Sequence, residues 1–468
     1  MTFDFDTIIP REGTHSVKWD GRKGVFNSED LIPMWVADMD FAVPESVSHA
    51  IKARAKHPVF GYTVADDSVY DALIHWMHKR HQFEVQRDWI ILSPGVVPSL
   101  HASAIAFAQA GEGVIVQPPV YFPFFSAVTE TGRKLILNPL KLDNGRYTID
   151  FDHLEQCASQ GARLLMLCTP HNPVGRVWSE KELRTVLDIA RRYDLVILSD
   201  EIHHDLIFPE ARHIPLQVLA DREGNPKAIE MTPIPKLGGN AVEFVPPSHG
   251  GRLGGNAVEF TPPPHGGRLG GGRSESSKTT DFTRTHPNSP PLGEGIKGRV
   301  FENIITAVAP SKTFNIPGLG LSALIVPNPQ HRVALRKAFE LLHTGASNPF
   351  SLVAFEAAYR GGEEWLEALL VYLTDTRDFV GQYLVDKIPK IKLIQPEGTY
   401  LLWLDCRELG MTDSELRQFF IHKAKVGMNP GTVFGEGGSG FMRMNIGASR
   451  QVVKEALDRI AKAVNEKG

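Results

Sequence analysis

A lysine in a turn bounded by proline and glycine is the first residue of this sequence that could do chemistry. Lys312 and the preceding Ser311 follow the apolar, strand-like residues 304–308, and Pro317 and Gly318 close the stretch. We therefore expect the lysine at the end of a strand, where α/β proteins bind ligands. Among apolar groups, a lysine loses its proton more easily and can act as an amine nucleophile. Most lysines only cover surface, so this signal needs others beside it.

Two polar residues follow other apolar strands. Asp200 stands directly after such a strand, where a buried carboxylate is costly unless it meets a cation. With His203 and His204 it could instead bind a metal, although no further cluster of ligands is visible. Asn172 comes just past another strand, where it could face a ligand or simply stabilise a turn before Pro173.

A helix start and a later strand add further candidates. Gly95 precedes a helix whose free backbone N–H groups would suit a phosphate, although a glycine at a strand-to-helix turn is common. Arg443 lies on an apolar strand, so its guanidinium needs an anionic partner, either a ligand or a structural carboxylate. Tyr121, in a proline-rich stretch, faces either the core or a ligand.

One cofactor uses these groups together. Pyridoxal phosphate needs a lysine for a Schiff base, a carboxylate at its ring nitrogen and a helix N-terminus for its phosphate. The carboxylate keeps the ring protonated, and a protonated ring accepts the electrons released when the Cα proton of a substrate leaves. Lys312, Asp200 and Gly95 thus indicate pyridoxal 5'-phosphate, and we expect no metal.

The elements that must position these residues alternate along the first half of the chain. Continuous apolar runs at residues 114–116, 164–167 and 195–198 are typical of parallel strands covered on both faces. A capping box, from Ser179 to Glu182, opens the helix between the last two runs, and a second, from Thr412 to Glu415, opens a helix to about residue 425. Residues 98–110, with Pro98 in the first turn, carry the small apolar residues of a buried helix. The alternation predicts a doubly wound α/β domain with a mostly parallel sheet. Farther along, strands and helices no longer alternate strictly, which predicts a smaller α+β domain.

We expect domain boundaries near residues 45 and 327. Residues 1–45 would form an N-terminal arm that joins the small domain, with an extended coil at residues 20–40. Residues 46–327 would form the large domain and residues 328–468 the small one.

A segment of different composition, residues 222–299, interrupts the large domain. Glycine and proline make up one third of it, and residues 237–252 are repeated with few changes as residues 253–268. Such composition cannot offset chain entropy, so it predicts a disordered surface insertion that arose by tandem duplication. The alternative is a binding or assembly loop.

Composition and charge exclude several classes of protein. The 468 residues are 42% hydrophobic and 22% charged, which suits a globular chain of two or three domains. A net charge of -4 gives no case for nucleic acid or an anionic membrane as partner. The three cysteines are too widely spaced for a disulfide framework, which favours a reducing compartment. The sequence shows no signal-peptide pattern and no apolar run long enough to span a membrane, so we expect a cytoplasmic protein.

The sequence resembles fold-type I pyridoxal-phosphate enzymes of the aminotransferase class I/II superfamily. Within it, the sequence is most similar to the MalY/PatB branch of carbon–sulfur β-lyases, the cystathionine β-lyase-like group. The likeness covers nearly everything outside residues 222–299. It is carried by six stretches: residues 16–20, 34–41, 93–97, 170–178, 199–203 and 309–315.

This resemblance implies a fold-type I large domain and a role for each candidate residue. Lys312 would hold the cofactor and move the Cα proton of the substrate. Asp200 would pair with the ring nitrogen, and Tyr121 would stack on the ring. Asn172 and His203 would lie near the phenolic oxygen of the ring.

The resemblance also implies how phosphate and substrate are held. The phosphate would be bound by the Val96 and Val97 N–H groups, Ser311 and Tyr62 of the partner subunit. The enzyme would therefore be a homodimer. Arg443 would take the substrate α-carboxylate, beside Val36 and Ala37. Two positions depart from the family pattern, because Ala309 stands where many relatives carry serine and no arginine lies near Gly320.

The implied reaction is β-elimination from an L-cysteine thioether such as L-cystathionine, which gives a thiol, pyruvate and ammonia. A class I/II aminotransferase would use the same residues up to the loss of the Cα proton, so the residues alone do not separate the two activities. A catalytically impaired or regulatory member of the family is a further alternative, because the insertion lies between Asp200 and Lys312.

Overall fold

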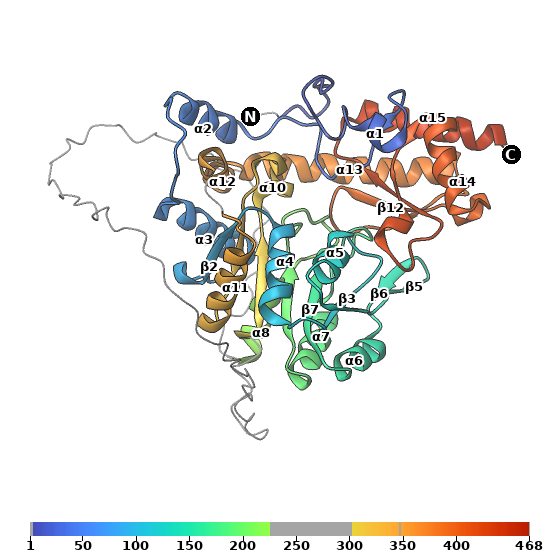
Figure 1. Ribbon diagram of the computed structural model, residues 1–468. Helices are drawn as coiled ribbons and strands as arrows, with labels where there is room; N and C mark the ends of the chain where they lie inside the picture. Colours follow the sequence, from blue (N-terminus) through green and yellow to red (C-terminus); the bar gives the residue numbers. More distant parts are fainter. Residues whose placement is uncertain (1–2, 225–301, 346–347, 468) are drawn as a thin grey trace, which may run out of the picture. The chain divides into compact units, whose positions relative to one another are not determined.

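The computed structural model describes residues 3–224, 302–345 and 348–467 (Figure 1). Its largest sheet has seven strands in the order β2-β10-β9-β8-β7-β3-β4. They are β2 (Ile90–Ser93), β3 (Gly113–Val116), β4 (Lys134–Leu137), β7 (Ala162–Cys168), β8 (Val196–Asp200), β9 (Ile304–Val308) and β10 (Ser322–Ile325). Only β10 runs antiparallel to its neighbours. The prediction of a mostly parallel sheet is therefore confirmed.

Helices cover both faces of this sheet because alternate strand residues point to opposite sides. On β3, Val114 and Val116 pack into a core with α4 (Val96–Phe107), α5 (Pro123–Thr129) and α11 (Pro329–Leu341). Ile115, between them, packs into a second core with α6 (Phe151–Ser159), α7 (Glu180–Arg192) and α8 (Leu216–Gly224). Figure 1 shows this layering, with α4, α5 and α11 drawn in front of the sheet.

The predicted capping box is confirmed at the start of α7. The Ser179 hydroxyl oxygen accepts a hydrogen bond from the backbone N–H of Glu182 at 3.3 Å. The Glu182 carboxylate accepts one from the backbone N–H of Ser179 at 2.7 Å. Both N–H groups would otherwise lack a partner within the helix, so the exchange fixes where the helix begins.

A smaller sheet lies in the C-terminal part of the chain. Its strands are antiparallel, in the order β11 (Lys392–Ile394), β12 (Leu401–Asp405), β15 (Phe441–Asn445) and β14 (Asn429–Pro430). The helices of this part are α12 (Pro349–Gly361), α13 (Glu363–Lys387), α14 (Asp413–Gln418) and α15 (Arg450–Lys467). The remaining hairpin pairs β5 (Lys141–Asp143) with β6 (Arg146–Thr148).

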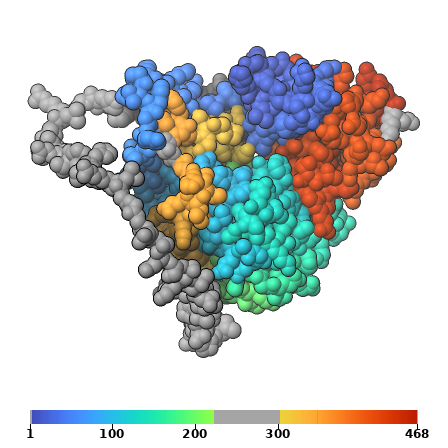
Figure 2. Space-filling model, viewed as in Figure 1, coloured from blue at the N-terminus to red at the C-terminus, as the bar shows by residue number. Residues whose placement is uncertain are grey.

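The N-terminal residues contact this C-terminal part directly. Strand β1 (Ile32–Pro33) pairs in parallel with β13 (Val426–Gly427). Figure 2 shows the N-terminal residues, in dark blue, against the C-terminal ones, in red. The domain boundaries at residues 45 and 327 stay a prediction. The insertion expected at residues 222–299 lies outside the described residues from residue 225 onward.

Three local expectations need correction. Residues 20–40 are not coil throughout, because Arg22–Phe26 form helix α1, where Phe26 is buried edge-on against Trp35 at a centroid distance of 5.4 Å. Helix α4 begins at Val96, two residues before the expected start at Pro98. Proline is tolerated throughout the first turn of a helix, because the backbone N–H groups there make no hydrogen bond within the helix. The helix expected from residue 412 to about 425 changes to a π-helical turn after Gln418.

None of the helices in the described ranges combines the length and the apolar character that crossing a membrane requires.

Candidate active site

Three of the predicted residues come together at one edge of the large sheet. Strands β7, β8 and β9 are parallel neighbours, with Cys168 paired to Asp200 and Asp200 paired to Ala307. Asp200 ends β8, and the segment after β9 leads within a few residues to Lys312 on α10 (Pro310–Thr313). Asn172 follows β7. The carboxyl ends of parallel strands thus gather the lysine, the carboxylate and the amide, as ligand sites in α/β sheets require.

Lys312 lies part-buried with its amine held by the N-terminal segment. Its Nζ donates a hydrogen bond to the Ala37 carbonyl oxygen at 2.7 Å. Burial, assisted by the Arg443 charge, lowers the pKa of Lys312 to about 8, against the attraction of Asp38 and Asp200. The neutral, nucleophilic amine is therefore far more abundant near neutral pH than for an ordinary lysine.

Asp200 is a buried carboxylate that forms no ion pair within the described ranges. Its side chain accepts a hydrogen bond from the Ile202 N–H at 3.2 Å, and the residue is only 4% exposed. Burial raises the pKa of Asp200 to about 7, the Glu201 charge adds to the rise, and the Ile202 N–H and Lys312 oppose it. A carboxylate placed in this way would gain stability from a cationic ligand.

Arg443, on β15, has neutral acceptors only. Its guanidinium donates to the Asn172 side-chain oxygen at 3.0 Å, the Asn429 side-chain oxygen at 2.8 Å and the Trp35 carbonyl at 2.9 Å. Its Nε is buried without a partner, and burial lowers the pKa of Arg443 to about 10. The alternative of a structural carboxylate is therefore wrong as far as the described residues go. The charge remains available to an anion.

Val36 and Ala37 lie in the N-terminal segment, and the Ala37 carbonyl accepts the hydrogen bond from the Lys312 amine. Their carbonyl groups are fixed from the C-terminal part of the chain. Asn445 donates its side-chain N–H to the Val36 carbonyl, and the Tyr400 hydroxyl donates to the Ala37 carbonyl at 2.9 Å. The Ala37 carbonyl thus receives two donors, Tyr400 and Lys312.

Tyr121 and His203 complete the group around the lysine. Tyr121 is part-buried, its backbone N–H donates to the Asn172 carbonyl at 3.1 Å, and burial raises the pKa of its hydroxyl. His203 is buried with its Nδ1 unpartnered. Burial, together with the charges of Lys312 and Arg443, lowers the pKa of His203 to about 3, so its ring is neutral near pH 7.

A phosphate-sized anion would fit the start of α4. Gly95 is the N-cap, and no side chain caps the helix, so the N–H groups of Val96 and Val97 have no capping partner. Gly320 adopts a φ of +43°, and a side chain there would come within 3.2 Å of the Pro94 carbonyl oxygen, so the turn after Lys312 approaches this helix start closely. Ser311 is part-buried on α10 next to Lys312.

Tyr62 stands apart from the other predicted residues. It lies between α2 (Glu45–Ala55) and α3 (Asp67–His81) and is fully exposed. Val59, Phe60 and Val64 in the same segment are also more than half exposed. Phe60 packs against Phe350 at a centroid distance of 5.4 Å, but much of the apolar surface of this segment stays exposed.

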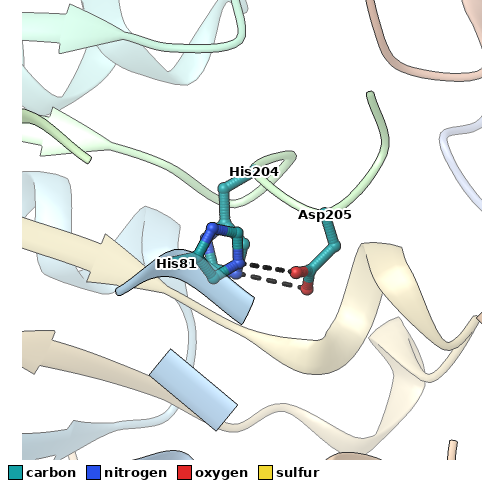
Figure 3. A group of neighbouring side chains, drawn as sticks. All are labelled: His81, His204 and Asp205. Atoms are coloured by element: carbon teal, nitrogen blue, oxygen red, sulfur yellow. Dashed lines mark hydrogen bonds and ion pairs between the residues drawn. The ribbon is translucent and has the colours of Figure 1, made fainter. Parts of the chain in front are cut away.

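The histidines of the metal alternative separate in the structure. His204 joins His81 and Asp205, and the donor atoms of these three residues lie within 4.8 Å of one another (Figure 3). Asp200 and His203 are not members of this cluster, and both lie close enough to Lys312 for its charge to lower their pKa values. The grouping of Asp200 with both histidines is therefore wrong for the described residues.

Several contacts at the site were not anticipated from the sequence. The Asn315 amide donates to the Met39 carbonyl at 2.9 Å and to the Phe41 carbonyl at 2.8 Å, which ties the lysine turn to the N-terminal segment. Asn315 stands in the same stretch as Lys312, residues 309–315, so its position was a usable signal. Tyr400, just before β12, and Asn445, at the end of β15, are far away in the sequence, where nothing local marks them.

Known proteins resemble the chain over nearly its whole length. The family model "Aminotransferase class I and II" matches residues 29–232 and 281–460. "Cystathionine beta-lyase PatB" of Bacillus subtilis is 35% identical over 99% of this chain and 100% of its own length. "Protein MalY" of Escherichia coli is 27% identical over 99% of both chains.

A solved structure agrees with these relatives. Cystalysin from Treponema denticola, whose crystal structure contains pyridoxal 5'-phosphate, matches with a TM-score of 0.81 and 31% identity, over 100% of both chains. Because the family model covers most of the sequence and the identity to PatB extends from end to end, the chain belongs to the aminotransferase class I and II family.

Proposed function

We propose that this chain is a pyridoxal-phosphate-dependent carbon–sulfur β-lyase that cleaves L-cystathionine or related L-cysteine S-conjugates. The observation that carries the proposal is the pair formed by Asp200 and Lys312. A buried carboxylate that forms no ion pair with any described residue ends β8, and a lysine with a lowered pKa follows the neighbouring parallel strand β9. The names of the relatives, cystathionine beta-lyase among them, support a lyase rather than an aminotransferase.

The residues present fit the cofactor. Asp200 needs a cation, which the protonated ring nitrogen supplies. The uncapped start of α4 and Ser311 need an anion, which the phosphate supplies. His203 Nδ1 is buried without a partner and, with Asn172, is available to the phenolic oxygen of the ring. Tyr121 would stack on the ring face.

Bound pyridoxal phosphate supplies an electron sink that accepts the electron pair left when the substrate Cα proton departs. Lys312 would hold the cofactor, and its amine would take the proton from the substrate Cα. Asp200 would pair with the ring nitrogen, and its negative charge would keep that nitrogen protonated. Cleavage of the Cβ–S bond with its electron pair on sulfur would release the thiol, which takes up a proton, and hydrolysis of the remaining three-carbon fragment would give pyruvate and ammonia.

The free Arg443 charge binds the substrate α-carboxylate. Asn172 and Asn429 hold the guanidinium in place through neutral oxygens, so no carboxylate of the described residues neutralises its charge. The Val36 and Ala37 backbone lies alongside, fixed by Asn445 and Tyr400. Substrate is thereby oriented with its Cα toward Lys312, which is the proximity that proton transfer needs.

The working enzyme is a homodimer in a reducing compartment, the cytoplasm. Tyr62 of the partner subunit adds to the phosphate site, which gives its fully exposed, apolar segment a covering surface. All three cysteines are free and buried, which suits a reducing environment. Light scattering at micromolar concentration tests the dimer, and a monomeric holoenzyme with full activity would contradict it.

A single incubation tests the activity. Purified protein with pyridoxal phosphate and L-cystathionine, without any keto acid, should release pyruvate, ammonia and a free thiol in equal amounts. Lys312→Ala should release none, whereas Lys337→Ala, a substitution on the outer helix α11, should match the wild type. Absence of pyruvate, with amino transfer once a keto acid is added, would replace the lyase by an aminotransferase. Absence of both reactions would indicate an impaired member of the family.

A further inference from the structure

Another buried carboxylate, that of Asp205, contacts the lysine turn. Asp205 is five residues beyond Asp200, in the turn that follows β8, and its side chain is inaccessible to solvent. It accepts a hydrogen bond from the Thr313 hydroxyl at 2.9 Å. Thr313 is the neighbour of Lys312, so this bond joins the segment that carries the acid to the segment that carries the amine.

Asp205 is held ionised by several donors. The Trp76 indole N–H donates to it at 3.2 Å and the His81 ring at 2.8 Å, both from α3. The Arg80 Nε lies 3.4 Å away and the His204 Nε2 3.2 Å away, and Figure 3 shows both imidazoles facing the carboxylate. Burial works against the charge, but His204 and His81 outweigh it and hold the pKa of Asp205 well below its usual range.

The cluster in Figure 3 has the composition of a metal site, but its geometry favours hydrogen bonding. The carboxylate oxygens of Asp205 already accept from Thr313, Trp76 and His81. A metal ion in their place would also lie close to the Arg80 guanidinium, which repels it. These hydrogen-bond donors therefore already hold the Asp205 carboxylate in place.

The lysine turn needs such an anchor. Helix α10 has four residues, about one turn, so its own backbone hydrogen bonds cannot determine its orientation. Phe314 packs edge-on against Trp76 at 5.5 Å, and Asn315 reaches the N-terminal segment. In the described part of the chain, the side-chain hydrogen bond that ties α10 to the Asp200 segment is the one from Thr313 to Asp205.

We propose that Asp205 is a positioning residue which, through Thr313, sets where the Lys312 amine stands relative to Asp200. This inference rests on the proposed function, since the two groups have to act on opposite parts of one cofactor ring. In the sequence, residues 222–299 separate Asp200 from Lys312, and the Thr313–Asp205 bond connects their segments across that separation. His81, His204 and Arg80 keep the carboxylate charged and in place for this task.

The test compares two valine substitutions. Thr313→Val removes the hydroxyl but keeps the shape and leaves Asp205 its other donors. Thr306→Val is the matched control, because Thr306 is also buried and donates at 2.9 Å to a buried side chain, that of Gln217. Both variants lose one buried hydrogen bond, so a purely structural role predicts similar losses of thermal stability and nothing else.

The holoenzymes are compared by kinetics and by their visible spectra. Thr313→Val should lower kcat by about 10- to 100-fold with little change in KM, because displacement of a catalytic group by about 1 Å has an effect of that size. The pH midpoint of the cofactor band should rise, since a looser lysine turn admits water and favours the protonated form. Thr313→Ser, which keeps the donor, should recover most of both effects. Thr306→Val should change neither.

Each outcome decides a different point. If wild-type protein shows no cofactor band or no pyruvate, the proposed function fails. If the wild type shows both, and Thr313→Val matches Thr306→Val in kcat and midpoint, the positioning role is overturned and the function stands. If Thr313→Val does not fold, Thr313→Cys, a weaker donor at the same place, should give an intermediate midpoint. An unchanged midpoint there overturns the proposal as well.

Discussion

Replacement of Asp200 by asparagine should stabilise the cofactor-free protein while it damages the enzyme. In the folded chain, burial raises the pKa of Asp200 from its ordinary 3.8 to about 7. Each pKa unit corresponds to about 1.4 kcal/mol, so above pH 7 the carboxylate destabilises the folded state by at most about 4 kcal/mol. Asparagine carries no charge and avoids this cost.

The sign of the pH dependence follows from the raised pKa. Well below pH 3.8 the carboxyl group is protonated in both folded and unfolded chains and contributes nothing. As the pH rises toward 7, the unfolded chain ionises first, so the wild type loses stability that Asp200→Asn keeps. The gain from Asp200→Asn should therefore be about 2 kcal/mol at pH 5.5 and up to about 4 kcal/mol at pH 8.

The assay is urea unfolding of cofactor-free protein at both pH values, with Glu201→Gln as matched control. Glu201 is the adjacent buried carboxylate, but it pairs with His213 at 2.9 Å and accepts from Ser199 at 2.8 Å. Removing one member of such a buried pair should destabilise the protein by about 3 to 5 kcal/mol. With cofactor, Asp200→Asn should lose about 100-fold or more in pyruvate formation. If Asp200→Asn is as destabilising at pH 8 as Glu201→Gln, Asp200 is not a carboxylate awaiting a cation.

Two further predictions concern Arg443 and Lys312. Arg443→Lys keeps the positive charge but loses the planar guanidinium that binds a carboxylate through two hydrogen bonds. The KM for L-cystathionine should therefore rise about 10- to 100-fold in steady-state assays. The control is Arg377→Lys, which alters a guanidinium bound to Glu210 and should leave KM unchanged. Equal KM values for the two variants would remove Arg443 from the substrate site. Because the pKa of Lys312 is lowered to about 8, the rate at which cofactor-free protein takes up pyridoxal phosphate should rise with pH and level off above about 8. A rate that still climbs steeply between pH 9 and 10, as for an ordinary lysine, would contradict this.

Much of the fold could be predicted because local signals and tertiary structure agree. The apolar runs at residues 114–116, 164–167 and 195–198 became strands β3, β7 and β8, because strands buried on both faces need apolar residues throughout. The capping boxes predicted at Ser179 and Thr412 are both present in the structure. These features depend on a few neighbouring residues, which a sequence displays directly.

The features that sequence reasoning missed are set by distant contacts. Helix α1 was missed because its stability comes from Phe26, which packs against Trp35 and not against its own turn. His204 was grouped with Asp200 by proximity in the sequence, yet its ring faces Asp205 and the α3 residue His81. Tyr400 contacts the Ala37 carbonyl from more than 350 positions away in the sequence, and no local pattern predicts such a contact.

The candidate site was predictable as a set of residue types, but not as a geometry. Lys312, Asp200, Asn172 and Arg443 stood out because each is a polar group in an apolar setting. What the structure adds is that Arg443 meets neutral oxygens only and that Asp200 forms no ion pair in the described ranges. Because these two charged groups lack charged partners in the described ranges, they are available to ligands. No sequence pattern reveals this.

The most direct measurement maps the residue to which the cofactor is attached. Holoenzyme is reduced with borohydride, digested, and searched by mass spectrometry for the peptide that carries the pyridoxyl phosphate group. The account predicts one modified residue, Lys312, with no fixed label in Lys312→Ala. A label fixed on another lysine, or no label in wild-type protein that shows the cofactor band, would contradict it.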